Sequence, residues 1–188
     1  IIDQLKGHKE DSTVTAVAWA TYSGRLSSFA SNQEDYYRVI IWEPRRNSSG
    51  WKLLQEFKLN IEVNCLSWSK GDNILCAASK QNFQIFTREE NRYNNNSEDP
   101  KKDKNKFYLN LVYTENIPTE FCSHSRDSRF ILTLPMRPET TKLNKIKKDS
   151  DTNEDNDISI KGVLIYYKRG KSDNDYTYVI IKHPAPVI

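Results

Sequence analysis

The stretch from Val63 to Phe86, VNCLSWSKGDNILCAASKQNFQIF, carries one complete unit of a pattern that the rest of the chain repeats imperfectly. Three short apolar segments alternate in it with two polar turns. The segments are 63–68, 74–79 and 83–86, and the turns are 69–73 and 80–82. Gly, Asp, Asn and Lys in such turns supply the backbone angles that a hairpin needs. The stretch therefore predicts three antiparallel strands rather than helices.

Two further units flank this one. The upstream unit has strands expected at 15–19, 26–31 and 39–42, and the downstream unit has them at 121–125, 129–134 and 163–167. One repeat position is occupied by Trp19, Trp68 and His124, and another by Trp42, Phe86 and Tyr166. The first set is spaced by 68 − 19 = 49 and 124 − 68 = 56 residues. Polar insertions account for the excess over the roughly 40 to 45 residues of a WD-type blade.

A strand-only repeat with an aromatic residue closing its third strand predicts an all-β, WD40-like β-propeller. We expect about three divergent blades plus part of a fourth. The alternating segment 107–113 is expected to open the third unit, and His183-Pro184, after the strand-like segment 178–181, is expected to begin another blade. Because propellers have roughly four to eight blades, the chain is expected to be a fragment of a larger protein.

The domain prediction is one partial propeller over residues 1–188. Two insertions between its predicted strands, 91–106 and 139–161, are rich in Asn, Lys and Asp and nearly devoid of large apolar side chains. Such segments cannot bury enough apolar surface to offset the entropy lost on ordering, so both are expected to be flexible. The other residues supply a core, because 37% of the chain is hydrophobic and 11% is aromatic.

Charge and cysteine usage exclude several function classes. The net charge is only 28 − 25 = +3, which argues against nucleic-acid binding by bulk charge. No apolar run approaches the 18 residues of a membrane span, so direct membrane insertion is not expected. Cys65, Cys76 and Cys122 lie in predicted strands without a CxxC motif. They favour reduced, buried thiols in a cytosolic protein, and no metal or cofactor is predicted.

Gly7-His8 has the form of the dipeptide that opens a WD repeat, in which the imidazole anchors a hydrogen-bond network to the closing aromatic ring. The alternative is a catalytic or metal-binding histidine, but no second His or Cys lies at ligand spacing. An enzyme at the ring's central opening would need converging carboxylates, histidines or metal ligands. His8, His124 and His183 fall instead at repeat or strand-boundary positions, so no catalytic residue is predicted.

The loop containing Arg45, Arg46 and Trp51 is the candidate interaction loop. Paired arginines beside a tryptophan can stack on a base or clamp a phosphate. The favoured interpretation is a solvated loop tip in which Trp51 covers the blade edge. His124, standing where the other units have Trp, is interpreted as a replacement at the edge of the core, and Trp42 as a packing residue.

Several stretches, taken in order, resemble the amino-terminal WD propeller of the DmX and rabconnectin family, which includes the large subunit of the yeast RAVE complex. These stretches are Gly24-Arg25-Leu26, Val39 to Pro44, Trp51, Val63 to Ser69 and Tyr178 to Pro184. The resemblance covers most of the chain apart from the two insertions. The WD dipeptide itself is replaced by Trp42-Glu43, Phe86-Thr87 and Tyr166-Tyr167.

The resemblance implies a non-catalytic scaffold that promotes or regulates assembly of the vacuolar-type proton-pumping ATPase (V-ATPase). Its implied partners are subunits of the peripheral sector of that pump and a regulatory adaptor. Its implied place is the cytoplasm, associated with acidic-organelle or vesicle membranes through those partners. The alternative is a WD-repeat scaffold in another pathway, such as trafficking, ubiquitin ligation or RNA processing, since propellers serve all of these.

Overall fold

The computed structural model describes six stretches of the chain. They are residues 5–33, 37–45, 50–88, 107–136, 162–170 and 175–182. Within these ranges the chain forms twelve β-strands and no helix. It follows that no helix in the described part is suited to crossing a membrane.

The strands form three antiparallel sheets of four. Sheet 1 contains β1 (Thr13–Trp19), β2 (Leu26–Ser31), β3 (Tyr37–Pro44) and β4 (Trp51–Lys58). Sheet 2 contains β5 (Val63–Trp68), β6 (Ile74–Ser79), β7 (Phe83–Arg88) and β8 (Leu109–Glu115). Sheet 3 contains β9 (Thr119–His124), β10 (Phe130–Pro135), β11 (Gly162–Lys168) and β12 (Tyr176–Lys182). In each sheet the spatial order of the strands follows the sequence, as in a propeller blade.

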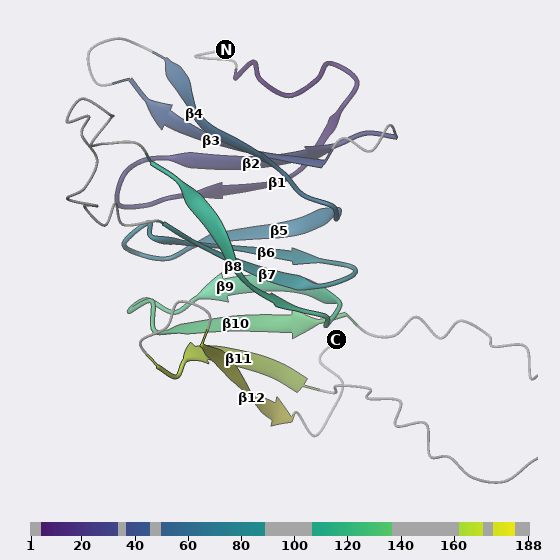
Figure 1. Ribbon diagram of the computed structural model, residues 1–188, viewed down its shortest axis with the longest axis vertical. Helices are drawn as coiled ribbons and strands as arrows, with labels where there is room; N and C mark the ends of the chain where they lie inside the picture. Colours follow the sequence, from purple (N-terminus) through teal and green to yellow (C-terminus); the bar gives the residue numbers. More distant parts are fainter. Residues whose placement is uncertain are drawn as a thin grey trace, which may run out of the picture.

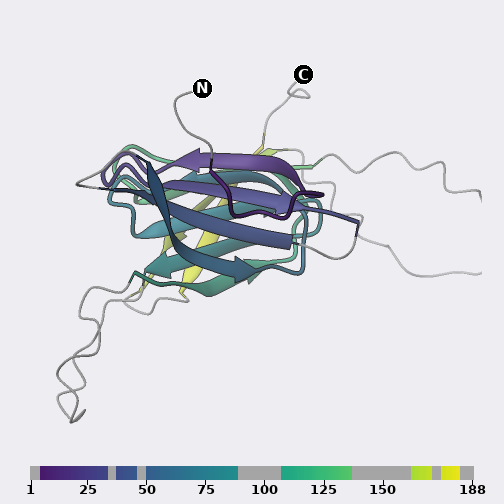
Figure 2. The same ribbon diagram turned by 90° about the horizontal axis from the view of Figure 1, so that it is seen from above.

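The three sheets are stacked face to face, with sheet 2 between the other two (Figure 1). The first strands of the sheets are neighbours, because β5 contacts both β1 and β9. In the view from above, sheet 1 lies over the other two (Figure 2). Successive blades of a propeller have this arrangement, with their first strands nearest the ring's centre.

The register aligns the two sets of repeat residues across the three sheets. Within each sheet, one residue of the second strand pairs with a member of the first set on one neighbouring strand and with a member of the second set on the other. Trp19 and Trp42 flank Leu26, Trp68 and Phe86 flank Leu75, and His124 and Tyr166 flank Ile131. Equivalent positions in the three sheets can therefore be compared residue by residue.

Two hydrophobic clusters fill the spaces between the sheets. The cluster between sheets 1 and 2 includes Phe29, Val63 and Phe86, and the cluster between sheets 2 and 3 includes Phe83, Leu164 and Tyr166. The strands of sheet 2 are apolar on both faces because that sheet is covered on both sides. Burial of this area is the main force that holds the stack together.

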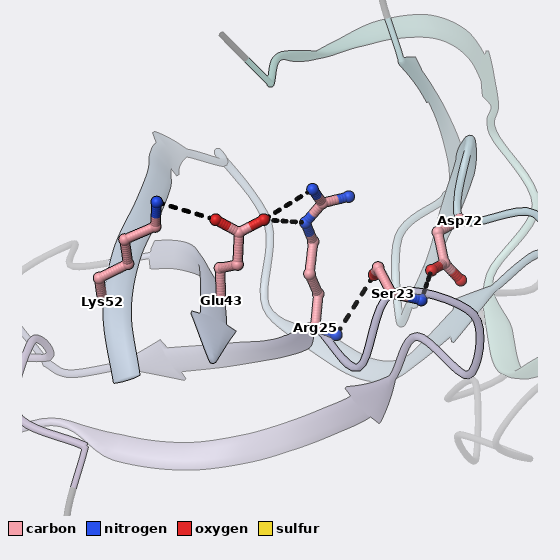
Figure 3. A network of polar contacts seen from close by, with 5 residues as sticks. All are labelled: Ser23, Arg25, Glu43, Lys52 and Asp72. Carbon is pink, nitrogen blue, oxygen red and sulfur yellow. Dashed lines mark hydrogen bonds and ion pairs between the residues drawn. The ribbon is translucent and has the colours of Figure 1, made fainter. Parts of the chain in front are cut away.

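A side chain in the first turn of each later sheet reaches the same turn of the sheet before it. The Asp72 carboxylate accepts a hydrogen bond from the backbone amide of Ser23 at 2.5 Å (Figure 3), and another from the backbone amide of Tyr22 at 3.5 Å. Ser128 repeats the contact one sheet later, where its Oγ accepts from the Lys70 amide at 2.7 Å. Asp72 and Ser128 have positive φ values of 56° and 59°. We call these contacts the turn clasps.

Beside the first turn clasp, Glu43 forms ion pairs with Arg25 at 2.8 Å and with Lys52 at 2.9 Å (Figure 3). Partial burial alone would raise the pKa of Glu43, but its bonds to Lys52 and Arg25 hold that pKa below its ordinary value. The Arg25 guanidinium also lies over the Phe107 ring, 4.4 Å from its centroid. This cation–π contact joins sheet 1 to the segment that leads into β8.

The structure corrects one boundary of the predicted repeat. Residues 107–113 do not open the third unit, because Leu109–Glu115 pairs with β7 as the fourth strand of sheet 2. Each unit therefore has four strands, and the fourth was invisible in the 63–86 stretch because an insertion precedes it. The predicted insertions, 91–106 and 139–161, and the expected next-blade start at His183 lie outside the described residues.

Candidate interaction surfaces

His8 lies in a polar network with the closing aromatic residue of sheet 1. Its Nε2 is 2.7 Å from the Ser28 hydroxyl, and that same oxygen accepts the Nε1–H of Trp42 at 2.8 Å. Gly7 leaves room for the Trp42 ring, which a β-carbon at that position would overlap. Burial lowers the pKa of His8, so the imidazole is neutral at neutral pH. The structure thus places His8 in a packing network.

His124 is held between sheets 2 and 3. Its backbone amide donates to Ser67 Oγ at 3.3 Å, and its Nδ1 lies 3.0 Å from that oxygen. The other ring nitrogen, Nε2, lies 3.5 Å from Cys76 Sγ. Burial lowers the pKa of His124 to about 4.

Trp68 makes the corresponding contact one sheet earlier. Its Nε1–H donates to the Ser27 hydroxyl at 3.0 Å, and the register makes Ser27 the equivalent of Cys76. The ring at the end of each first strand thus points toward the preceding sheet. No described sheet precedes sheet 1, so the equivalent Trp19 is 55% exposed, whereas Trp68 is 8% exposed. The outer face of sheet 1 has the character of a blade-packing face.

Phe86 and Tyr166, which stand in the place of Trp42, also face the preceding sheet. The Phe86 ring packs on Phe57 of sheet 1, with centroids 5.1 Å apart. Tyr166 packs on Phe83 of sheet 2 at 4.9 Å. Within the described ranges the Tyr166 hydroxyl has no hydrogen-bond partner, and burial raises the pKa of this phenol.

The outer face of sheet 3 holds an apolar groove of about 720 Å³. Its lining residues are Phe121, Ser123, His124, Ser125, Phe130, Leu132, Ile165, Tyr167 and Val179. Leu132 is 41% exposed, although its register equivalents Ser27 and Cys76 are buried beneath the next sheet. We name this surface the sheet 3 groove.

The groove was not predicted from the sequence. Phe130, Leu132 and Leu134 recur at every second position of β10, so a two-residue apolar period was visible in that strand. That period predicts a buried face for every strand, and it does not show which sheet lies at the end of a stack. The exposure of these residues depends on tertiary structure alone.

The candidate interaction loop is only partly described. Trp51, half-buried, begins β4 and meets the exposed Trp19 edge to face, with ring centroids 5.5 Å apart. Arg45 is exposed and its backbone amide donates to the Gly50 carbonyl at 3.0 Å, while Arg46 lies outside the described residues. The described part of the loop thus places one arginine and one tryptophan at one end of sheet 1.

Among the residues described, no three His, Cys, Asp or Glu side chains lie close enough together to hold a metal ion. His183 lies beyond them. The two described histidines each bond to a serine hydroxyl. The surfaces to consider for binding are therefore the sheet faces and their rims.

No protein-family model matches the sequence, and no relative is found among curated proteins. Solved structures do match. Sqt1 from Chaetomium thermophilum is 8% identical with a TM-score of 0.55, and the match covers 94% of this chain and 38% of that one. Sqt1 from Saccharomyces cerevisiae is 9% identical with a TM-score of 0.54, over 93% and 37%.

A third match is a "putative 6-phosphogluconolactonase" from Bacteroides uniformis, 10% identical with a TM-score of 0.54, covering 92% of this chain and 43% of that one. The chain thus spans about two fifths of the length of these structures. At such low identities the likeness is one of fold. It confirms the predicted class: the described residues form three blades of a WD40-like β-propeller.

Proposed function

We propose that the chain is a non-catalytic propeller scaffold and that the outer faces of sheets 1 and 3 are assembly surfaces. The observation that carries the proposal is the exposure of Trp19 and Leu132 at positions that are buried between sheets elsewhere in the stack. The outer face of sheet 1 resembles the face that sheet 2 turns toward it. The sheet 3 groove resembles the face that sheet 2 turns toward sheet 3.

Each outer face fits one kind of occupant, a further four-stranded blade of the same ring. In the two interfaces already present, a ring at the end of a first strand, Trp68 or His124, enters the preceding sheet beside a hydroxyl or thiol group. The sheet 3 groove offers Ser123 and an apolar wall to such a ring. The matching solved structures are more than twice as long as this chain, which agrees with additional blades.

The non-catalytic role is supported by the state of the two described histidines. His8 and His124 are neutral, engaged with Ser28 and Ser67, and turned into the packing between strands. A general acid or base needs access to a substrate and a pKa near the working pH. The likeness to a lactonase adds nothing to the enzyme reading, because it concerns the fold.

The finer role rests on the sequence resemblance. The scaffold would promote or regulate assembly of the V-ATPase by binding subunits of its peripheral sector and an adaptor, in the cytoplasm at the surface of acidic organelles. Arg45, Arg46 and Trp51 form the proposed contact loop, since arginine and tryptophan are enriched among energetically dominant interface residues. A scaffold in another pathway is the alternative, and the propeller suits it equally.

The blade-packing role of the sheet 3 groove is tested with Leu132→Asp in the 188-residue chain. Leu111→Asp is the matched control, because Leu111 is similarly exposed, at 50%, on β8 and outside the groove. An uncovered packing face drives self-association, so sedimentation velocity should show concentration-dependent oligomers for the wild type and the control. Leu132→Asp should be monomeric. Equal behaviour of all three chains would remove the packing role.

The pump role is tested separately, by mixing the chain with the purified peripheral sector of a V-ATPase from the same source and measuring binding by interferometry. Binding that Arg45→Glu with Trp51→Ala abolishes, and that Lys70→Glu in a turn of sheet 2 leaves intact, supports the proposed loop. No binding by the wild type discards the pump and leaves the scaffold in another pathway. Binding unaffected by the loop changes keeps the pump and discards the loop.

A further inference from the structure

Two cysteines from different sheets face each other in the stack. Cys65 on β5 and Cys122 on β9 are 57 positions apart in sequence, and their sulfur atoms are 3.9 Å apart. Each thiol also lies near the other residue's backbone carbonyl, at 3.5 Å for Cys65 Sγ and 3.8 Å for Cys122 Sγ. The reciprocal contacts place the two residues at the same level of neighbouring strands.

We propose that Cys65 and Cys122 form an oxidisable dithiol, which small disulfides such as glutathione disulfide convert into a cross-link between sheets 2 and 3. A disulfide requires the sulfur atoms to approach to about 2 Å, which needs rotation of the side chains and little shift of strands that already lie side by side. The cross-link would add a covalent bond between two blades that are otherwise held by apolar packing and hydrogen bonds.

The two thiols have different roles in this reaction. Cys65 is partly exposed and Cys122 is buried. The Cys122 S–H points to Cys65 Sγ, and this bond holds the pKa of Cys65 below its usual range while it raises that of Cys122. Cys65 is therefore the attacking thiolate and Cys122 the thiol that completes the bridge.

The oxidation proceeds in two exchanges. Cys65 thiolate attacks one sulfur of glutathione disulfide, forms a mixed disulfide and releases one glutathione thiolate. Cys122 then loses its proton and attacks Cys65 Sγ, which expels the second glutathione thiolate. The protein loses two protons and two electrons, and glutathione disulfide is reduced to two molecules of glutathione.

The third cysteine provides the matched control. Cys76 is buried on β6, and its Sγ lies against His124 Nε2 at 3.5 Å. Cys76→Ser should therefore leave the oxidation unchanged. Trypsin separates the three cysteines, because they fall on peptides 59–70, 71–80 and 107–126.

The experiment exposes the 188-residue chain to glutathione disulfide, quenches with acid and N-ethylmaleimide, and measures intact mass and non-reduced peptides. The wild type and Cys76→Ser should lose two hydrogens and yield peptide 59–70 joined to 107–126. Cys122→Ser should instead retain one glutathionyl group on Cys65, and Cys65→Ser should react at least tenfold more slowly. A cross-link involving 71–80, or a wild type that keeps both thiols, would overturn the proposal.

A second readout guards against variants that misfold. Closing a loop of this length restricts the unfolded chain, so the oxidised wild type should melt at a higher temperature than the reduced wild type. The same rise is expected in Cys76→Ser and none in Cys122→Ser. An oxidised wild type that melts at a lower temperature would show that the bridge distorts the stack, and would contradict the geometry proposed for it.

Discussion

Sheets 1 and 2 fill the same buried position in two different ways. In sheet 1, Ser28 bonds to His8 and accepts the indole N–H of Trp42. In sheet 2 the register puts Ala77 and Phe86 in the places of Ser28 and Trp42, and both are buried. A buried polar group needs a partner, whereas a pair of apolar groups needs none. The network can therefore be replaced as a set without loss of the blade.

At the same two positions, sheet 3 is intermediate between sheets 1 and 2. Thr133 stands in the place of Ser28 and Tyr166 in the place of Trp42. Both side-chain oxygens are buried without a hydrogen-bond partner in the described part of the chain. The three sheets thus show a complete polar set, an apolar set and a polar pair without its histidine. The difference explains how a blade can keep its shape without a WD dipeptide.

The largest expected effect on stability comes from removing one member of the apolar pair in sheet 2, Ala77 and Phe86. Phe86→Ala removes a ring that packs on Phe57 and leaves a cavity between sheets 1 and 2. The free energy of unfolding should fall by about 3–5 kcal/mol, as for other buried aromatic truncations. Urea unfolding followed by tryptophan fluorescence measures it. Leu111→Ala, at an exposed site, is the control, and equal losses for the two would mean that Phe86 is not part of a packed core.

Acid should affect sheets 2 and 3 differently, because sheet 3 has the titratable His124 at the position where sheet 2 has Trp68. The pKa of His124 is about 4 in the folded protein, against an ordinary value of 6.5. Between these values the unfolded chain binds a proton that the folded chain does not, so stability falls as pH falls from 6.5 to 4. The loss is up to about 3 kcal/mol.

Unfolding curves across that range for the wild type and His124→Asn test this point. Asn keeps a partner for Ser67 but does not titrate, so its stability should change less with pH. His8 and Glu43 contribute equally to both proteins and cancel in the comparison. Parallel pH profiles for the two proteins would show that His124 is protonated at no cost in the fold.

A smaller effect on stability comes from removing only one member of the polar network in sheet 1. Ser28→Ala leaves the Trp42 indole N–H and the His8 ring without their shared partner, at an expected cost of about 1–3 kcal/mol. Adding Trp42→Phe, which imitates sheet 2, should restore part of the loss. A thermodynamic cycle measures the coupling, and strictly additive effects would contradict the view that the network acts as a set.

The smallest expected effect concerns the ion pair of sheet 1. Arg25 and Glu43 occupy the register positions of Ile74 and Thr87 in sheet 2. Glu43→Thr should lower stability by less than about 1 kcal/mol, because Arg25 and Glu43 keep 15% and 22% of their side chains exposed and solvent screens the pair. The same change at high salt should have less effect still. A loss above that of Ser28→Ala would reverse the ranking of the two polar features.

The sequence predicted the first three strands of each unit because their signals are local. The turn at 69–73 and the alternating segment 63–68 needed no tertiary knowledge, and the structure has β5 at Val63–Trp68. The place of Leu109–Glu115 was predicted wrongly because a strand's own residues do not say which neighbour it pairs with. That choice depends on hydrogen bonds across an insertion.

The surfaces were predictable only in part. The rings at 19, 68 and 124 were identified as one repeat position, yet their very different exposures follow from which sheets lie at the ends of the stack. Likewise, three cysteines in strands predicted buried thiols, which is confirmed for Cys76 and Cys122 and wrong for the partly exposed Cys65. That Cys65 and Cys122 lie opposite each other depends on how β5 and β9 stack, and no spacing in the sequence encodes it.

The turn clasps have a direction. Asp72 and Ser128 each reach the turn of the sheet made before their own, and the Trp68 and His124 rings reach serine hydroxyls in the strands of that earlier sheet. During synthesis the amino-terminal part of a chain leaves the ribosome first and folds first. Each new blade therefore meets the amides and hydroxyls that it needs on a surface already in place. The propeller can grow one blade at a time, in the order in which it is translated.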